Sequence, residues 1–213
     1  MRGARSTTYD SAMTEVTSGS DGVRERILDA ATECVIESGI DARLHAAIAE
    51  RAGVSRPTVY KYVGDQTAIL RAVLDREVER FFAAATPVFT AMNEDESQWL
   101  DDAIVFVVDY ARRHTLLQMA LHRYPGLILP ALTTNSEGLI DGVVAAFSEH
   151  VEQRLARTGG DGDVRAIVEW AYRIAVSLVI TPSTATQDEA NLRRHLAELT
   201  PLIELLGQRA PSR

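Results

Sequence analysis

The stretch of this chain that decides its fold runs from residue 48 to residue 66 and reads Ile-Ala-Glu-Arg-Ala-Gly-Val-Ser-Arg-Pro-Thr-Val-Tyr-Lys-Tyr-Val-Gly-Asp-Gln. A first helix must end at Gly53, because glycine enters the left-handed conformation at little cost. The Ser55 hydroxyl can cap a second helix. Pro57 falls in the first turn of that helix, where its missing N–H loses no hydrogen bond. The pattern therefore predicts two short helices joined by a tight turn.

The second of these helices has a short, mostly polar surface, as a helix that lies in a DNA major groove requires. We expect Arg56 to read a base, because a guanidinium can donate two hydrogen bonds to guanine. The hydroxyls of Tyr60 and Tyr62 would contact phosphates and fix the register, and Lys61 would contact a phosphate or a base. The candidate DNA-binding residues are Ser55, Arg56, Thr58, Tyr60, Lys61 and Tyr62, with His45 and Gln66 at the edges. A solvated surface position for Arg56 and a core position for Tyr62 stay open.

The charge of the chain is unevenly distributed. The formal net charge is −8, which by itself argues against a nucleic-acid partner. Residues 43–63, however, hold Arg43, Arg51, Arg56 and Lys61 against Glu50 alone. A small basic patch on an acidic body can bind phosphates while the body discourages loose binding elsewhere.

The rest of the chain predicts an all-α protein of about nine helices, because apolar residues recur at three- and four-residue spacing almost throughout. Residues 1–20 lack this period and are predicted to be a disordered tail. A first helix is expected from near Gly22 to Ser38, and a long helix capped by Asp65 is expected to break or bend at Pro87. The expected domains are a DNA-binding domain at 21–67 and a helical domain at 68–213.

Other functional classes receive little support. The N-terminus has no apolar run typical of a signal peptide, and no apolar stretch is long enough to span a bilayer, so we expect a cytoplasmic protein. The single cysteine, Cys34, excludes an intrachain disulfide. No metal or phosphate-binding motif and no Glu-x-x-His pair of a di-iron bundle is present, and no cofactor is expected. A Ser/His/Asp triad stays open as an enzymatic alternative.

The segment from about residue 23 to residue 74 resembles the DNA-binding domain of the TetR family of bacterial transcriptional regulators. The resemblance rests on Ile48 to Ser55, on Thr58 to Tyr62, on Gly39 at the end of the first helix, and on the downstream Ile69-Leu70. The chain departs from the family pattern at Pro57, where glycine is common, and at Gln66, where a lysine is common. The resemblance implies a regulator that binds a double-stranded, pseudo-palindromic operator and is not an enzyme.

The resemblance also implies a homodimer, whose two recognition helices reach successive major grooves. The last two helices are then the expected dimer surface, built on Ala171, Ala175, Leu178, Leu196, Leu199 and Ile203. The alternative is that these apolar side chains face only their own core.

The larger domain should hold a small-molecule effector, again by resemblance. The candidate lining is mainly apolar and aromatic: Phe81, Phe89, Met92, Trp99, Phe106, Tyr110, Met119, His122, Tyr124, Phe147 and Trp170. Such a set predicts a hydrophobic or amphipathic ligand that releases a repressor from its operator. For each residue, ordinary core packing is the alternative. A helical dimer that has lost DNA binding and acts through protein contacts is the alternative function.

Overall fold

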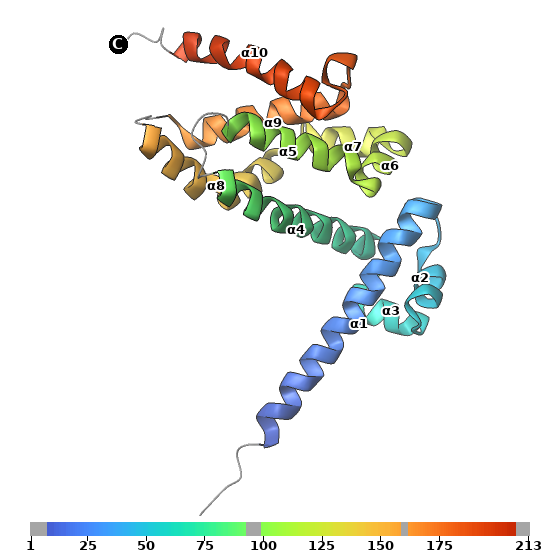
Figure 1. Ribbon diagram of the computed structural model, residues 1–213. Coiled ribbons are helices and arrows are strands. Elements are labelled where there is room, and N and C mark those ends of the chain that lie inside the picture. The colour runs from blue at the N-terminus through green and yellow to red at the C-terminus, as the bar shows by residue number, and fades with distance from the viewer. Residues whose placement is uncertain (1–7, 93–98, 159–161, 208–213) are drawn as a thin grey trace, which may run out of the picture. The chain divides into compact units, whose positions relative to one another are not determined.

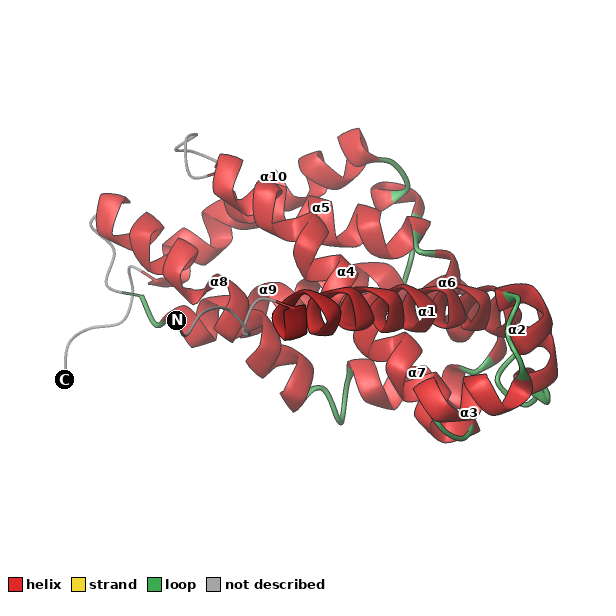
Figure 2. Cartoon of the chain, turned by 90° about the horizontal axis from the view of Figure 1, so that it is seen from below, coloured by secondary structure: helices red, strands yellow, loops and turns green. Residues whose placement is uncertain are grey.

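The computed structural model describes the backbone of residues 8–92, 99–158 and 162–207, and the side chains of 21–91, 99–157 and 162–198. These residues form helices and connecting loops without strands, so the predicted all-α class is confirmed (Figures 1 and 2). The chain divides into two compact units, Met1–Arg80 and Phe81–Arg213. The division between these units falls at Arg80, later along the chain than the domain boundary predicted after residue 67.

Unit 1 contains α1 (Thr8–Ser38), α2 (Leu44–Ala52), α3 (Arg56–Val63) and the first part of α4 (Gln66–Met92). The α1 helix packs against both α2 and α3. Buried apolar side chains from all four helices form its core: Ile27, Leu28, Ala31, Val35, Leu44, Ile48, Val59, Val63, Ile69 and Val73. The α1 backbone is helical from Thr8, so the start predicted near Gly22 is not the one observed. The reason is that residues 8–21 include no proline that would end a helix.

A buried arginine fastens α4 to α1 within unit 1. Arg76 is 6% exposed. Its guanidinium donates hydrogen bonds to the Leu28 carbonyl oxygen at 2.8 Å, to the Thr32 hydroxyl at 2.6 Å and to the Asp29 carboxylate at 2.9 Å. The exposed Arg80 binds the same carboxylate at 3.0 Å. An arginine, with five donors in a fixed fork, can hold all these acceptors at once, so Arg76 fixes the register of α4 on α1.

Pro87 does not break α4, so of the two predicted outcomes, a break or a bend, the break is wrong. The helix continues from Gln66 to Met92 with Pro87 inside it. Proline removes one backbone donor, which leaves the carbonyl of Ala83 without its usual partner. Both Ala83 and Pro87 are exposed, so water can satisfy that carbonyl. A proline on the solvent side of a helix costs less than one facing a core.

Unit 2 contains the end of α4, then α5 (Trp99–Arg113), α6 (Thr115–Arg123), α7 (Pro125–Leu132), α8 (Glu137–Thr158), α9 (Val164–Ile180) and α10 (Glu189–Gly207), with a 3-10 turn at Thr184–Thr186. The α9 helix packs against α5 and α8, and α10 packs against α5. The α7 helix is an addition to the nine predicted, because Pro125 was interpreted as a break. Pro125 instead opens α7, at a position that needs no N–H. Among the described residues, no helix is long and apolar enough to cross a membrane.

Apolar side chains of α9 and α10 pack into the core of their own chain. Ala175 and Leu196 are buried in a cluster with Ile104, Val105 and Val108 of α5, and Ala171 and Leu178 pack against that cluster. Two of the six residues predicted for the dimer surface, Ala175 and Leu196, are thus buried within their own chain, while Ala171 and Leu178 are only partly buried, and the dimer surface stays a prediction. The other two, Leu199 and Ile203, lie outside the residues whose side chains are described.

Candidate functional site

Backbone and side-chain hydrogen bonds stabilise the turn between α2 and α3 at both of its ends. Gly53 has φ of 65°, in the left-handed region, and its N–H donates to the carbonyls of Ala49 and Glu50. The Ser55 hydroxyl accepts from the Thr58 N–H at 3.2 Å and lies 2.7 Å from the Thr58 hydroxyl. The predicted glycine stop and serine cap are both confirmed. At the other end of the motif, Asp65 caps α4 by accepting from the Ala68 N–H at 2.9 Å.

Gly64, which ends α3, is more constrained than Gly53. It has φ of 78° and ψ of −148°, a region that is essentially restricted to glycine. A Cβ added there would lie 3.0 Å from the Cβ of Ala68, whereas one added at Gly53 would meet nothing within 4 Å. Both positions have a positive φ, and only Gly64 adds a steric conflict.

Replacing Gly64 with alanine is therefore expected to destabilise unit 1 by roughly 1–3 kcal/mol, and Gly53→Ala by about 1 kcal/mol. Urea unfolding of the two variants, followed by circular dichroism, measures the difference. Equal midpoints for Gly64→Ala and the wild type would show that the backbone at this position is not strained.

The outer surface of α3 presents four exposed side chains, those of Arg56, Pro57, Tyr60 and Lys61, of which all but Pro57 are polar. Within the described part of the chain, the Arg56 guanidinium has no hydrogen-bond or ion-pair partner. The Lys61 ammonium lies over the Tyr62 ring, 5.5 Å from its centroid. Tyr62 and Thr58 are partly buried, and the core of unit 1 takes Val59 and Val63 from the opposite face of the helix. The helix thus separates an apolar inner face from a polar outer one.

Two of the predicted DNA-binding residues are engaged inside unit 1. His45 is 7% exposed, hydrogen-bonds the Gly64 carbonyl at 3.1 Å, and stacks on Tyr60 with ring centroids 4.0 Å apart. The Gln66 amide donates to the Ile40 carbonyl at 2.8 Å. Both bonds join parts of the chain that are distant in sequence, so sequence spacing could not reveal them. His45 supports the Tyr60 ring rather than facing solvent.

The basic patch is smaller than its composition suggests. Arg51 binds the Glu37 carboxylate at 2.7 Å and lies 3.5 Å from that of Glu33, both on α1. The hydrogen bond that Arg51 donates to the Glu37 carboxylate is the main reason that the pKa of Arg51 is raised. Arg43, Arg51, Arg56 and Lys61 are all exposed. Arg51 differs from the others in its ion pairs with α1, which reduce the positive charge that this surface offers to a polyanion.

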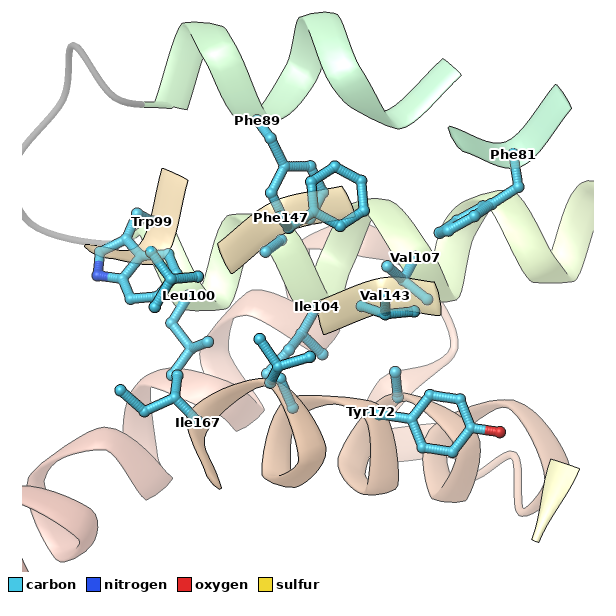
Figure 3. A pocket seen from close by; sticks show the side chains of 15 residues that line it. Phe81, Phe89, Trp99, Leu100, Ile104, Val107, Val143, Phe147, Ile167 and Tyr172 are labelled. Carbon is cyan, nitrogen blue, oxygen red and sulfur yellow. The ribbon is translucent and has the colours of Figure 1, made fainter. Parts of the chain in front are cut away.

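Unit 2 contains a partly open apolar cavity of about 140 Å³ between the end of α4 and helices α5, α8 and α9 (Figure 3). Four of the predicted residues line it: Phe81, Phe89, Trp99 and Phe147. The remaining lining is mostly aliphatic: Leu100, Ala103, Ile104, Val107, Val143, Val151, Ile167, Val168, Ala171, Tyr172 and Ala175. The sequence analysis missed these residues because a cavity-lining valine and a core valine have the same helical spacing.

The other predicted ligand residues lie away from the lining. Phe106 and Tyr110 lie beside the Phe81 ring, with ring centroids 6.4 Å and 5.3 Å from it, and are not part of the lining. Met119, His122 and Tyr124 belong to α6 and its end, and none of them lines the cavity. Trp170 is 38% exposed on α9. Met92 falls outside the described side chains.

Tyr172 carries the one ionisable side chain of the described lining. Its hydroxyl donates to the Leu132 carbonyl at 2.9 Å, and Figure 3 shows it pointing away from the other labelled side chains. Burial raises the pKa of Tyr172 above its ordinary value, with a smaller opposing effect from Ser136. The phenol is therefore neutral near pH 7 and places no charge in the cavity.

Comparisons with known proteins agree with this architecture. Residues 27–73 match the model of bacterial regulatory proteins of the tetR family, and residues 95–200 match that of the bacterial tetracyclin repressor C-terminal domain. An uncharacterized HTH-type transcriptional regulator of Mycobacterium bovis is 33% identical over 72% of this chain and 78% of its own length. A counterpart in Mycobacterium tuberculosis is 32% identical over the same shares.

Solved structures share the fold. A putative TetR-family regulator from Mesorhizobium loti has a TM-score of 0.61 at 21% identity, covering 85% of this chain and 97% of its own. The multidrug binding protein EbrR, complexed with ethidium, has a TM-score of 0.52 at 23% identity, covering 83% and 97%. The family and the relatives are transcriptional regulators, not enzymes. By its helix-turn-helix, its C-terminal helical domain and these relatives, the chain belongs to the TetR family of bacterial transcriptional regulators.

Proposed function

We propose that this regulator is a repressor that binds a pseudo-palindromic operator as a homodimer and releases it when unit 2 binds a small hydrophobic or amphipathic molecule. One observation carries the proposal: α3 exposes Arg56, Tyr60 and Lys61 on a helix whose inner face is packed and whose N-terminus is capped. Such a helix is rigid before it meets DNA, so little ordering is required on binding.

The proposed roles on α3 are now narrower than the sequence alone allowed. Arg56 reads a guanine, because its guanidinium is exposed and uncommitted within the described residues. Tyr60 and Lys61 contact phosphates, and Ser55, Thr58 and Tyr62 contact the DNA backbone at the edges of the interface. We no longer propose that His45 and Gln66 contact DNA, because their hydrogen bonds hold unit 1 together. His45 instead positions Tyr60 by stacking.

The homodimer is proposed because one short recognition helix offers too few contacts for specific binding. Two copies can place their α3 helices one duplex turn apart, roughly 34–36 Å, or a multiple of it. Trp170, an exposed indole on α9, suits a subunit contact better than the ligand role predicted for it. Size-exclusion chromatography with light scattering tests the dimer, and a single-chain mass at micromolar concentration would exclude it.

The release mechanism is a shift of population. A ligand that binds one conformation of the dimer better than another moves the equilibrium toward it. In this mechanism α4 transmits the effect of ligand binding to the DNA-binding helices. Phe81 and Phe89 of α4 line the cavity, and Arg76 of the same helix donates a hydrogen bond to α1. That EbrR was solved with ethidium fits the proposal that unit 2 holds a ligand.

A gel-shift assay with DNA upstream of the chain's own gene tests the function. We expect a retarded complex that survives non-specific competitor DNA. Retention of the complex only without competitor would favour the alternative, a helical dimer that acts through protein contacts. Addition of ligand should reduce the complex, and a panel of hydrophobic molecules that gives neither heat of binding nor release would exclude the effector role.

Lys61→Ala is expected to weaken operator and random DNA alike, because a phosphate contact carries no sequence information. Loss of one contact should lower the slope of log K against log salt concentration by about one unit. Fluorescence anisotropy at several salt concentrations measures that slope. Glu50→Ala, at an exposed anionic position on α2, is a control for nonspecific effects of charge. An unchanged slope in Lys61→Ala would remove Lys61 from the DNA interface.

A further inference from the structure

We infer that the cavity of unit 2 takes a compact, uncharged aromatic molecule about the size of a single six-membered ring. That this molecule is also the effector rests on the function proposed above. The inference narrows the hydrophobic or amphipathic class expected from composition. It depends on three properties of the described lining: its lack of charge, its volume, and the arrangement of its aromatic rings.

The first property is that the described lining offers no group that could pair with a charged ligand. The described lining residues are apolar except for Trp99 and Tyr172, and the Tyr172 hydroxyl is already bonded to Leu132. In Figure 3 the Trp99 indole nitrogen lies at the edge of the cluster of labelled side chains. An ionised group moved from water into such surroundings costs several kcal/mol unless it is paired. The described residues supply no such pair, so a carboxylate or ammonium ligand is disfavoured.

The second property is size. The cavity holds about 140 Å³. An engineered cavity of roughly 150 Å³ lined by leucine, isoleucine and phenylalanine stays dry and binds benzene. A molecule of several fused rings would have to displace packed side chains, of which Ile104 and Phe147 are only 2% exposed, or extend out of the partly open cavity into water. Overpacking costs energy, and a part of the ligand left in water gains no burial, so the undistorted cavity favours small molecules.

The third property is the arrangement of aromatic rings. Phe89 of α4 stacks on Phe147 of α8, with ring centroids 4.2 Å apart and ring planes at 20° to each other. Phe81 and Trp99 approach from other sides, and aliphatic groups of Ile104, Val107 and Val143 cover the remaining faces (Figure 3). A flat ring can make offset or edge contacts with these side chains, which adds to the gain from area burial. A linear alkane would gain area burial alone.

The test uses the purified full-length protein without DNA. Isothermal titration with toluene should give saturable binding, and benzoate and benzylamine should bind at least about 100-fold more weakly. Hexane, which is apolar but not aromatic, should bind more weakly than toluene. If benzoate or benzylamine binds as tightly as toluene, the claim that the uncharged lining excludes charged ligands is overturned. Hexane binding as tight as toluene would overturn the aromatic preference, and no binding of toluene would overturn the site.

Two variants locate the site. Ala171→Leu fills the cavity from α9 and should weaken toluene binding by more than about tenfold. Ala145→Leu makes the same change on α8, two residues from both Val143 and Phe147 and so on the opposite face, where Ala145 is exposed. It should bind toluene as the wild type does. If Ala171→Leu does not fold, Val143→Ile adds a single methylene at the lining and should also weaken binding.

The outcome is separable from that of the proposed function. Toluene binding is measured without DNA, and operator release is measured afterwards by gel shift. Binding that Ala171→Leu weakens, without release of the operator, would support the cavity inference and overturn the effector role. Release of the operator by toluene from Ala171→Leu at wild-type concentrations would overturn the cavity inference and leave regulation intact.

Discussion

Replacing Arg76 with methionine is expected to lower the free energy of unfolding of unit 1 by about 2–4 kcal/mol. The guanidinium is buried and donates to Leu28, Asp29 and Thr32 of α1. Methionine has a similar length and no donor, so the variant loses these bonds without opening a large cavity. Asp29 is exposed and can be solvated again, which keeps the cost below that of a wholly buried ion pair. Thermal unfolding followed by circular dichroism measures the loss.

Two further variants separate the causes. Arg80→Met removes an exposed arginine that binds the same Asp29 carboxylate, and it should cost less than about 1 kcal/mol because surface ion pairs contribute little. Arg76→Lys retains the charge without the planar fork, and it should recover only part of the stability. If Arg76→Met and Arg80→Met unfold at the same temperature, the buried hydrogen bonds of Arg76 contribute nothing special.

The Arg76 variant also bears on regulation. Because Arg76 fixes α4 on α1 and Phe81 begins the cavity lining one and a half turns later, a loosened register should weaken the response to ligand at a temperature where unit 1 is still folded. Ligand binding itself should not change, since the cavity residues are untouched. Titration of ligand into the protein–operator complex measures the response.

Replacing Arg56 with alanine is expected to cost about 1–3 kcal/mol of operator affinity per recognition helix and to relax base preference at one position. The reason is that an exposed guanidinium on the outer face of α3 can form a bidentate contact with guanine O6 and N7. The discrimination is lost with the side chain, while phosphate contacts from Tyr60 and Lys61 remain. Binding to a library of operators with single base changes measures the preference directly.

The matched control for this variant is Arg43→Ala. Arg43 is also exposed, but it stands at the N-terminus of α2 rather than on α3. Its loss should weaken all DNA sequences alike or have no effect. Affinity that falls equally on every sequence in Arg56→Ala would reassign Arg56 to the phosphate backbone.

Local sequence patterns were sufficient for the helix-turn-helix. Gly53, Ser55 and Asp65 act through hydrogen bonds to residues at most four positions away, so their chemistry predicted their positions correctly. Local patterns failed where an environment decides the outcome. Pro87 was predicted to break or bend a helix. The helix α4 continues through it, because the Ala83 carbonyl that loses its backbone donor lies at an exposed position. Pro125 was interpreted as a break, but it opens α7.

The side chains that meet partners distant in sequence needed the tertiary structure. His45 and Gln66 carry groups that can bind DNA, and only the fold shows them bonded to Gly64 and Ile40. Arg51 counts as a cation in the sequence and is paired with Glu37 in the structure. The small residues of α9 gave the same ambiguity: spacing made Ala171 and Ala175 equally suited to a dimer surface and to a core, and the structure packs them against the α5 cluster.

The sequence by itself determined the family, the all-α class and the helix-turn-helix, because helix ends and apolar periods depend on interactions within one or two turns. Only the tertiary structure decided which polar groups of that motif and its neighbours stay exposed, and which apolar residues line a cavity rather than fill a core. Both outcomes depend on which helices pack together, and side-chain spacing along one helix does not specify the neighbour that covers it.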